Sequence, residues 1–165
     1  MPILDHNTLE SFSRSPDQTR RLGMRLGALL HPGDLICLRG DLGAGKTTLV
    51  QGMAQGWGSL DSVTSPTFVL VNEYHRPDAK RMFHLDAYRL ESAPEAEELD
   101  LDIMLVDGPL VIEWPERISS ILPDECLWIN LEYVNEEHRD LIFSAKGARF
   151  QNLLATFRQS AYGVG

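Results

Sequence analysis

The residues best suited to chemistry form one glycine-rich stretch, which reads Gly40-Asp41-Leu42-Gly43-Ala44-Gly45-Lys46-Thr47-Thr48. Its first eight residues match the pattern G-x-x-x-x-G-K-[ST], which cradles the phosphates of a nucleotide. Glycines let successive backbone N–H groups point at phosphate oxygens, and a helix that follows adds its positive N-terminal end. Lys46 would bridge the β- and γ-phosphates, and the Thr47 hydroxyl would bind Mg²⁺. An apolar stretch precedes the loop, so a glycine-rich turn with an incidental lysine is the weaker interpretation.

Two acids are expected to serve the same site. Glu113 ends the apolar run 110–112, and Asp86 ends the run 82–85. Ligands of open α/β sheets collect at the carboxyl ends of the strands. Glu113 would bind Mg²⁺ directly or through water, and Asp86 would join the metal shell or orient the attacking water. The alternatives are a surface acid after a strand for Glu113 and a turn cap for Asp86.

A hydroxyl from a separate loop is a further candidate. Thr67 lies in the stretch Ser65-Pro66-Thr67-Phe68 and could offer its hydroxyl to Mg²⁺ or to the γ-phosphate. Taken alone, such a threonine is more often an ordinary turn residue.

Alternating apolar runs and turn signals predict the elements that must position these residues. A helix should start at Ser15-Pro16-Asp17 and stop before His31-Pro32-Gly33. Further helices are expected at 46–56, 94–99 (short and acidic) and 147–162, and strands at 34–39, 67–74, 82–86, 110–113, 126–133 and 140–144. This order predicts the α/β class: a P-loop NTPase-type three-layer domain with a mainly parallel central sheet and some antiparallel strands late in the chain. We expect one domain over 1–165, in which 147–165 form a C-terminal helix or tail.

Charge is concentrated in one segment. The 165 residues hold 15 Lys and Arg against 24 Asp and Glu, a net charge of −9. Residues 90–116 hold nine acids and no Lys or Arg, which accounts for the whole excess. An acidic chain is a poor general nucleic-acid binder. Glu116 is expected to be a solvated acid, and the cluster from Glu91 to Asp102 is expected to be a solvated face or a surface that meets a basic partner.

Other signals bear on the compartment. Cys37 and Cys126 form no metal-ligand pattern and are expected to be buried and reduced. No apolar run approaches the ~18 residues of a membrane span, and the first residues lack the features of a signal peptide. A cytoplasmic protein without membrane contact is therefore expected.

The nucleotide class follows from missing motifs. The sequence contains no Asn-Lys-x-Asp element for reading guanine, so ATP or ADP is expected rather than a guanine nucleotide. A small-molecule kinase would need an arginine-rich lid over the transferred phosphoryl group. The middle of the chain is instead arginine-free and acidic, which disfavours that class.

Four motifs together resemble the TsaE (YjeE) family, from about Ser15 to Arg139. The motifs are residues 40–48, Ser65-Pro66-Thr67-Phe68, His84-Leu85-Asp86-Ala87-Tyr88-Arg89 and Ile112-Glu113-Trp114-Pro115. The resemblance implies a bacterial P-loop ATPase of tRNA threonylcarbamoyladenosine biosynthesis. It implies that TsaD with TsaB transfers threonylcarbamoyl to adenosine 37 of tRNAs that read codons beginning with A. The present chain would dock on that pair, hydrolyse ATP only weakly by itself, and meet tRNA only indirectly through the complex.

The resemblance also assigns site residues. It implies that residues 43–48 hold the phosphates, that Thr47 and Glu113 bind Mg²⁺, and that Asp86 lies near the metal and the γ-phosphate. Thr67 would be the threonine of the family's Ser-Pro-Thr loop. Trp114 would lie beside the site, and Arg139 near the adenine. Two alternatives stay open: a nucleotide-gated docking module in which hydrolysis is not essential, and a small-molecule kinase.

Overall fold

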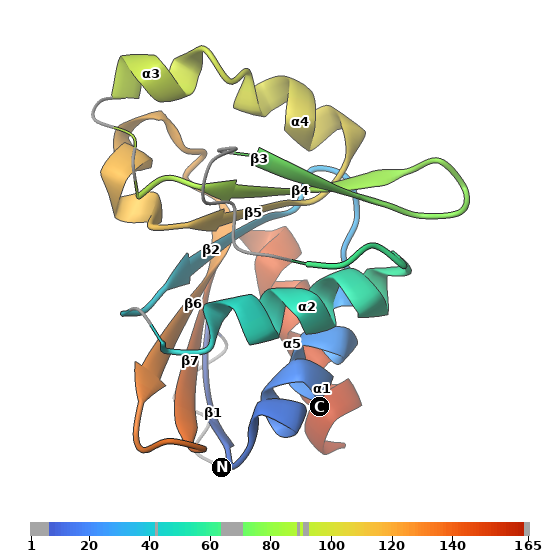
Figure 1. The fold of residues 1–165 in the computed structure, drawn as a ribbon, viewed down its shortest axis with the longest axis vertical. Coiled ribbons are helices and arrows are strands. Elements are labelled where there is room, and N and C mark those ends of the chain that lie inside the picture. Colours follow the sequence, from blue (N-terminus) through green and yellow to red (C-terminus); the bar gives the residue numbers. More distant parts are fainter. Residues whose placement is uncertain (1–6, 42, 64–70, 89, 91–92, 164–165) are drawn as a thin grey trace.

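The computed structural model describes residues 7–41, 43–63, 71–88, 90 and 93–163 (Figure 1). Its elements follow one another in the order β1 (Thr8–Ser13), α1 (Pro16–Gly27), β2 (Leu35–Arg39), α2 (Lys46–Trp57), β3 (Val71–His75), β4 (Arg81–Asp86), α3 (Ala93–Glu97), α4 (Leu101–Asp107), β5 (Leu110–Glu113), the 3₁₀ segment η1 (Pro115–Ile121), β6 (Cys126–Tyr133), β7 (Arg139–Lys146) and α5 (Ala148–Tyr162). The alternation of strands and helices confirms the α/β class.

The strands form one seven-stranded mixed sheet in the order β1-β7-β6-β2-β5-β4-β3. Its centre is parallel, since β2 pairs with β5 and β6, and β5 pairs with β4. Its edges are antiparallel, where β1 pairs with β7, β7 with β6, and β3 with β4. The expected late antiparallel pair is present as β6 and β7. The prediction of a mainly parallel sheet is confirmed only for the centre, because antiparallel pairing also occurs at the first strand and in mid-chain.

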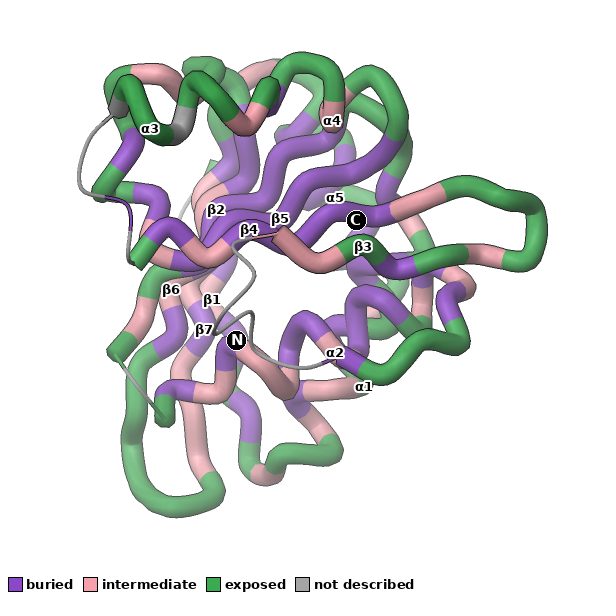
Figure 2. The backbone as a smooth tube through the Cα atoms, turned by 45° about the horizontal axis from the view of Figure 1, so that its top comes forward, coloured by how far each residue is buried: buried purple, intermediate pink, exposed green. Residues whose placement is uncertain are grey.

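Helices cover both faces of the sheet, as expected for three layers. Helices α1, α2 and α5 lie on one side and α3 and α4 on the other (Figure 1). Alternate residues of β2 face opposite cores: Ile36 and Leu38 pack in the first, while Leu35 and Cys37 pack in the second. Strands β2, β4 and β5 are buried almost throughout, as Figure 2 shows. Continuous apolar runs such as these suit parallel strands that are covered on both faces.

Helices α1 and α2 pack unusually closely through glycines. A Cβ atom built at Gly27 would lie 2.0 Å from the Met53 carbonyl oxygen, and one at Gly52 would lie 2.0 Å from the Arg20 carbonyl oxygen. Only glycine allows two helix backbones to approach this far. Because α2 begins at Lys46, this contact fixes the helix that follows the glycine-rich loop.

One further expectation concerns the two cysteines. Both Cys37 and Cys126 are buried and free, as predicted. Over the described residues, each helix is too short or too polar to span a membrane. Three elements were not predicted: β1, α4 and the 3₁₀ segment η1.

Candidate nucleotide-binding site

The glycine-rich loop joins β2 to α2, which is the strand–loop–helix arrangement that the motif requires. Gly43 and Gly45 have φ angles of 81° and 100°, in the left-handed region that glycine adopts without strain. Helix α2 starts at Lys46 with no side-chain cap and no acid in its first turn. The first amides of a helix lack partners inside the helix, so an uncapped N-terminus of this kind suits an anion.

Lys46 is almost fully buried at the centre of the site. Its Nζ donates a hydrogen bond to the Gly40 carbonyl oxygen and lies 4.4 Å from the centroid of the Trp114 ring. Burial lowers the pKa of Lys46, and the nearby carboxylates of Glu113 and Asp86 partly offset that effect. A buried ammonium that donates to a backbone carbonyl within the loop suits an incoming phosphate.

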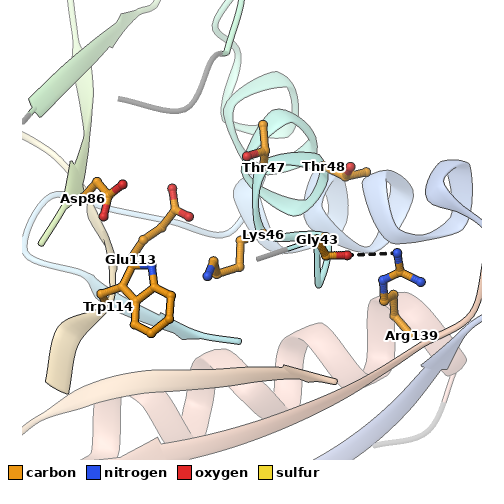
Figure 3. Close-up of a pocket in the computed structure, with 9 residues that line it drawn as sticks. Gly43, Lys46, Thr47, Thr48, Asp86, Glu113, Trp114 and Arg139 are labelled. Carbon is orange, nitrogen blue, oxygen red and sulfur yellow. Dashed lines mark hydrogen bonds between the residues drawn. The ribbon is translucent and has the colours of Figure 1, made fainter. Parts of the chain in front are cut away.

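Asp86 and Glu113 reach the site from neighbouring parallel strands. They are register partners at the carboxyl ends of β4 and β5, so their side chains lie on the same face of the sheet (Figure 3). Burial raises the pKa of Asp86, a hydrogen bond from the Tyr88 amide (2.9 Å) counteracts it, and the charge of Glu113 adds to it. The structure therefore brings these two acids to the same cavity.

A buried hydrogen-bonded chain leads away from Glu113. His84 is fully buried, and its Nε2 lies 2.6 Å from Glu113 Oε2. On the other side of the ring, His84 Nδ1 lies 2.8 Å from the hydroxyl of Tyr74, which is 2% exposed. Neither His84 nor Tyr74 received a role from the sequence. The available signal was that His84 precedes Asp86 by two residues and so shares its face of β4.

Arg139 and Trp114 border the site from opposite sides (Figure 3). Arg139 donates from Nη2 to the Gly43 carbonyl oxygen (3.0 Å) and from Nε to the Ala44 carbonyl oxygen (3.1 Å). It therefore holds the backbone of the glycine-rich loop in place. Trp114 has φ 58°, a left-handed conformation that costs energy for a residue with a side chain.

The structure brings most of the predicted residues to one cavity of about 290 Å³. The cavity is lined by Gly43, Gly45, Lys46, Thr47, Thr48, Asp86, Glu113, Trp114 and Arg139. Gly40 and Asp41 line an adjacent hollow that Trp114 also borders, and Ala44, within the loop, is buried. Leu42 and Thr67 lie outside the described residues, so their predicted roles remain predictions.

The fold and the loop define an α/β protein with a Walker A sequence between a central parallel strand and a helix. The family model described as "Threonylcarbamoyl adenosine biosynthesis protein TsaE" matches residues 13–141. The chain belongs to the TsaE family, as its motifs predict.

Relatives support the same assignment over most of the chain. The Bacillus subtilis "tRNA threonylcarbamoyladenosine biosynthesis protein TsaE" is 37% identical over 140 residues, which cover 84% of this chain and 87% of the relative. The protein of the same name from Nostoc is 36% identical over 162 residues, which cover 93% and 98%. The crystal structure of Bacillus subtilis YdiB superposes with a TM-score of 0.77 at 30% identity, covering 93% of this chain and 95% of that one.

Proposed function

We propose that this chain is an ATP-binding, Mg²⁺-dependent ATPase subunit of tRNA threonylcarbamoyladenosine biosynthesis. It would act with TsaD and TsaB, which would transfer threonylcarbamoyl to adenosine 37, and it would meet tRNA only through that complex. Family membership supports the pathway. The observation that carries the chemistry is the convergence of Lys46, Thr47, Asp86 and Glu113 on one cavity.

The donor set fits ATP with Mg²⁺. The uncapped start of α2 offers backbone amides, and the Lys46 ammonium lies beside them. Mg²⁺ is commonly held by one or two carboxylates and a hydroxyl together with the phosphates of the substrate. Thr47, Asp86 and Glu113 offer those groups. When bound, Mg²⁺ would neutralise the charge that develops on the phosphates.

Each residue then has a distinct task. Lys46 would exchange the Gly40 carbonyl for β- and γ-phosphate oxygens, and the negative phosphates would favour its charged form. The Thr47 hydroxyl and the Glu113 carboxylate would hold the metal. Asp86, register partner of Glu113, would orient the attacking water or complete the metal shell. Trp114, whose ring lies against Lys46, would limit the access of bulk water.

ATP hydrolysis, measured with and without Mg²⁺ and with and without TsaB–TsaD, tests the proposal. We expect slow hydrolysis by the chain alone and faster Mg²⁺-dependent hydrolysis when the TsaB–TsaD complex is added. Lys46→Ala removes the ammonium and should lower the stimulated rate by at least ~100-fold. Lys80→Ala makes the same change at an exposed lysine outside the cavity, and as the matched control it should leave the rate unchanged. Stimulated hydrolysis that survives Lys46→Ala would show that the site is wrongly assigned.

Glu113→Ala and Asp86→Ala separate the ATPase from a nucleotide-gated docking module. Both variants should retain nucleotide binding, because Lys46 and the loop amides remain, and both should lose hydrolysis. If threonylcarbamoylation of tRNA by the complete system continues at the normal rate with these variants, hydrolysis is not essential and the docking module is the better description.

A further inference from the structure

The buried hydrogen bonds behind Glu113 have one donor-to-acceptor direction, from Tyr74 through His84 to Glu113. Burial raises the pKa of Tyr74 to about 12, and the side chain of Asn72 partly counteracts that effect. At neutral pH Tyr74 therefore keeps its proton. Its O–H can donate to His84 Nδ1, 2.8 Å away, while on the other side of the ring Nε2 faces a carboxylate oxygen, which accepts.

A donor at Nδ1 determines the state of the imidazole. Nδ1 must then be unprotonated, so the ring carries its proton on Nε2. Nε2 faces Glu113 Oε2 at 2.6 Å, where an N–H can donate to an ionised carboxylate. His84 is 0% exposed and Glu113 4% exposed, so water does not compete for these contacts. A charge-assisted hydrogen bond in such surroundings holds its partners in one geometry.

The strand register explains why these side chains meet. Asn72 on β3 is the register partner of His84 on β4, and Asp86 on β4 is the register partner of Glu113 on β5. Residues two apart on a strand share a face, so Tyr74, His84 and Glu113 follow a diagonal across three adjacent strands. The diagonal ends at the cavity that Glu113 and Asp86 line.

We propose that His84 is a positioning residue: its Nε2–H holds Glu113 Oε2, and the Tyr74 hydroxyl holds the ring in the tautomer that makes this possible. Glu113 Oε1 is thereby left to face the metal, and the carboxylate need not reorganise when Mg²⁺–ATP arrives. This inference rests on the proposed function, since it gives Glu113 its orientation for that ligand. Partners of this kind behind metal-binding side chains change metal affinity by about 10–100-fold when removed.

Two substitutions of similar size separate positioning from packing. In His84→Gln the amide nitrogen can take the place of Nε2 and still donate to Glu113. In His84→Asn the shorter side chain reaches only the position of Nδ1, so contact with Tyr74 is kept and the donor to Glu113 is lost. His75→Asn changes an exposed histidine on β3 and serves as the control.

The first readout is the Mg²⁺ concentration for half-maximal ATP hydrolysis in the presence of TsaB–TsaD. We expect His84→Asn to raise it by at least ~10-fold, and His84→Gln and His75→Asn to stay near wild type. Nucleotide affinity without Mg²⁺, measured by calorimetry, should be the same in all four proteins. Equal Mg²⁺ requirements for the Asn and Gln variants would overturn the proposal. A wild-type protein without any Mg²⁺-dependent hydrolysis would instead overturn the proposed function.

The second readout does not depend on activity. Nitrogen-15 NMR of the histidine side chains in the nucleotide-free protein should show His84 protonated at Nε2 and unprotonated at Nδ1. Tyr74→Phe, which keeps the ring and removes the O–H, should weaken that preference and raise the Mg²⁺ requirement. If His84 carries its proton on Nδ1 in the wild-type protein, or if Tyr74→Phe changes neither measurement, the proposal is wrong. These measurements do not use a His84 variant, so they test the proposal even if His84→Asn fails to fold.

Discussion

Replacing Gly52 by alanine would test the close packing that fixes the phosphate-loop helix. Gly52 lies on α2 where that helix crosses α1. An alanine Cβ would lie 2.0 Å from the Arg20 carbonyl oxygen, 2.9 Å from its carbonyl carbon and 3.0 Å from the Met24 amide nitrogen. All three atoms belong to the backbone, so no change of side-chain rotamer can relieve the clash, and the two helices must separate.

Two opposing effects decide how much Gly52→Ala changes the stability of the fold. Alanine is favoured over glycine inside a helix by about 1 kcal/mol. Overpacking a well-packed core costs about 1–3 kcal/mol and occasionally more. Because this obstacle is backbone, we expect a cost above that range and a net loss of stability of at least ~2 kcal/mol. For a chain of this length, that loss lowers the Tm by about 4–8 °C.

Scanning calorimetry of the nucleotide-free protein measures the effect. Gln55→Ala is the matched control, because Gln55 is exposed on the same helix and should change the Tm little. A rise in Tm for Gly52→Ala, or an unchanged Tm, would refute the close approach of α1 and α2.

Three further sets of substitutions test other parts of the structure. Folding favours the protonated form of Asp86, because burial and nearby Glu113 raise its pKa above 3.8. The stability that protonated Asp86 contributes to the fold is complete below the unfolded-state pKa. It is lost as the pH rises through the raised folded-state pKa. Asp86→Asn should therefore raise the Tm of the nucleotide-free protein at pH 7 more than at pH 4 while abolishing hydrolysis, and a lower Tm at pH 7 would contradict this. Arg149→Met should destabilise the fold by about 1–3 kcal/mol in urea unfolding, because it leaves the buried Asp34 carboxylate without its 2.7 and 2.9 Å contacts; an unchanged midpoint would contradict it. A triple variant would replace three exposed acids by lysine: Glu95, Glu97 and Glu98. It should slow association with TsaB–TsaD by about tenfold in surface plasmon resonance at low salt and leave the ATP affinity unchanged. An unaltered association rate would show that the acidic cluster is a solvated face.

Sequence reasoning succeeded where burial leaves a simple pattern. The strand at 110–113 and the strand at 126–133 have the predicted bounds, because their apolar runs are buried in the sheet. The short acidic helix was expected at 94–99 and is observed as α3 at Ala93–Glu97. The phosphate loop was found because its chemistry requires fixed residues at fixed spacing.

Elements without such a pattern were missed. Strand β1 buries Ser11 and Ser13 beside Leu9, so small polar residues occupy positions that usually reveal a strand by apolar alternation. Helix α4 exposes Ile103 and Val106, so it has no polar face to mark it as a helix. Both cases follow from tertiary packing, which local pattern does not encode.

The sequence predicted which residues line the site but not which residues hold them in position. Lys46, Thr47, Asp86 and Glu113 each follow from a local motif or strand end, and the structure brings them together. The contacts from His84 to Glu113 and Tyr74 depend on the pairing of β3, β4 and β5. Neither the order nor the register of those strands can be obtained from one sequence. The antiparallel pairing of β3 with β4 escaped prediction for the same reason.

A crystal structure with Mg²⁺ and a non-hydrolysable ATP analogue tests the central claim most directly. The account predicts the β- and γ-phosphates on the amides of residues 43–48, with Lys46 Nζ moved from the Gly40 carbonyl to the phosphates. It predicts Mg²⁺ at about 2.0–2.1 Å from the Thr47 hydroxyl, with Glu113 and Asp86 bound to it directly or through water. A nucleotide bound elsewhere, or phosphates in the loop with Mg²⁺ remote from both carboxylates, would contradict it.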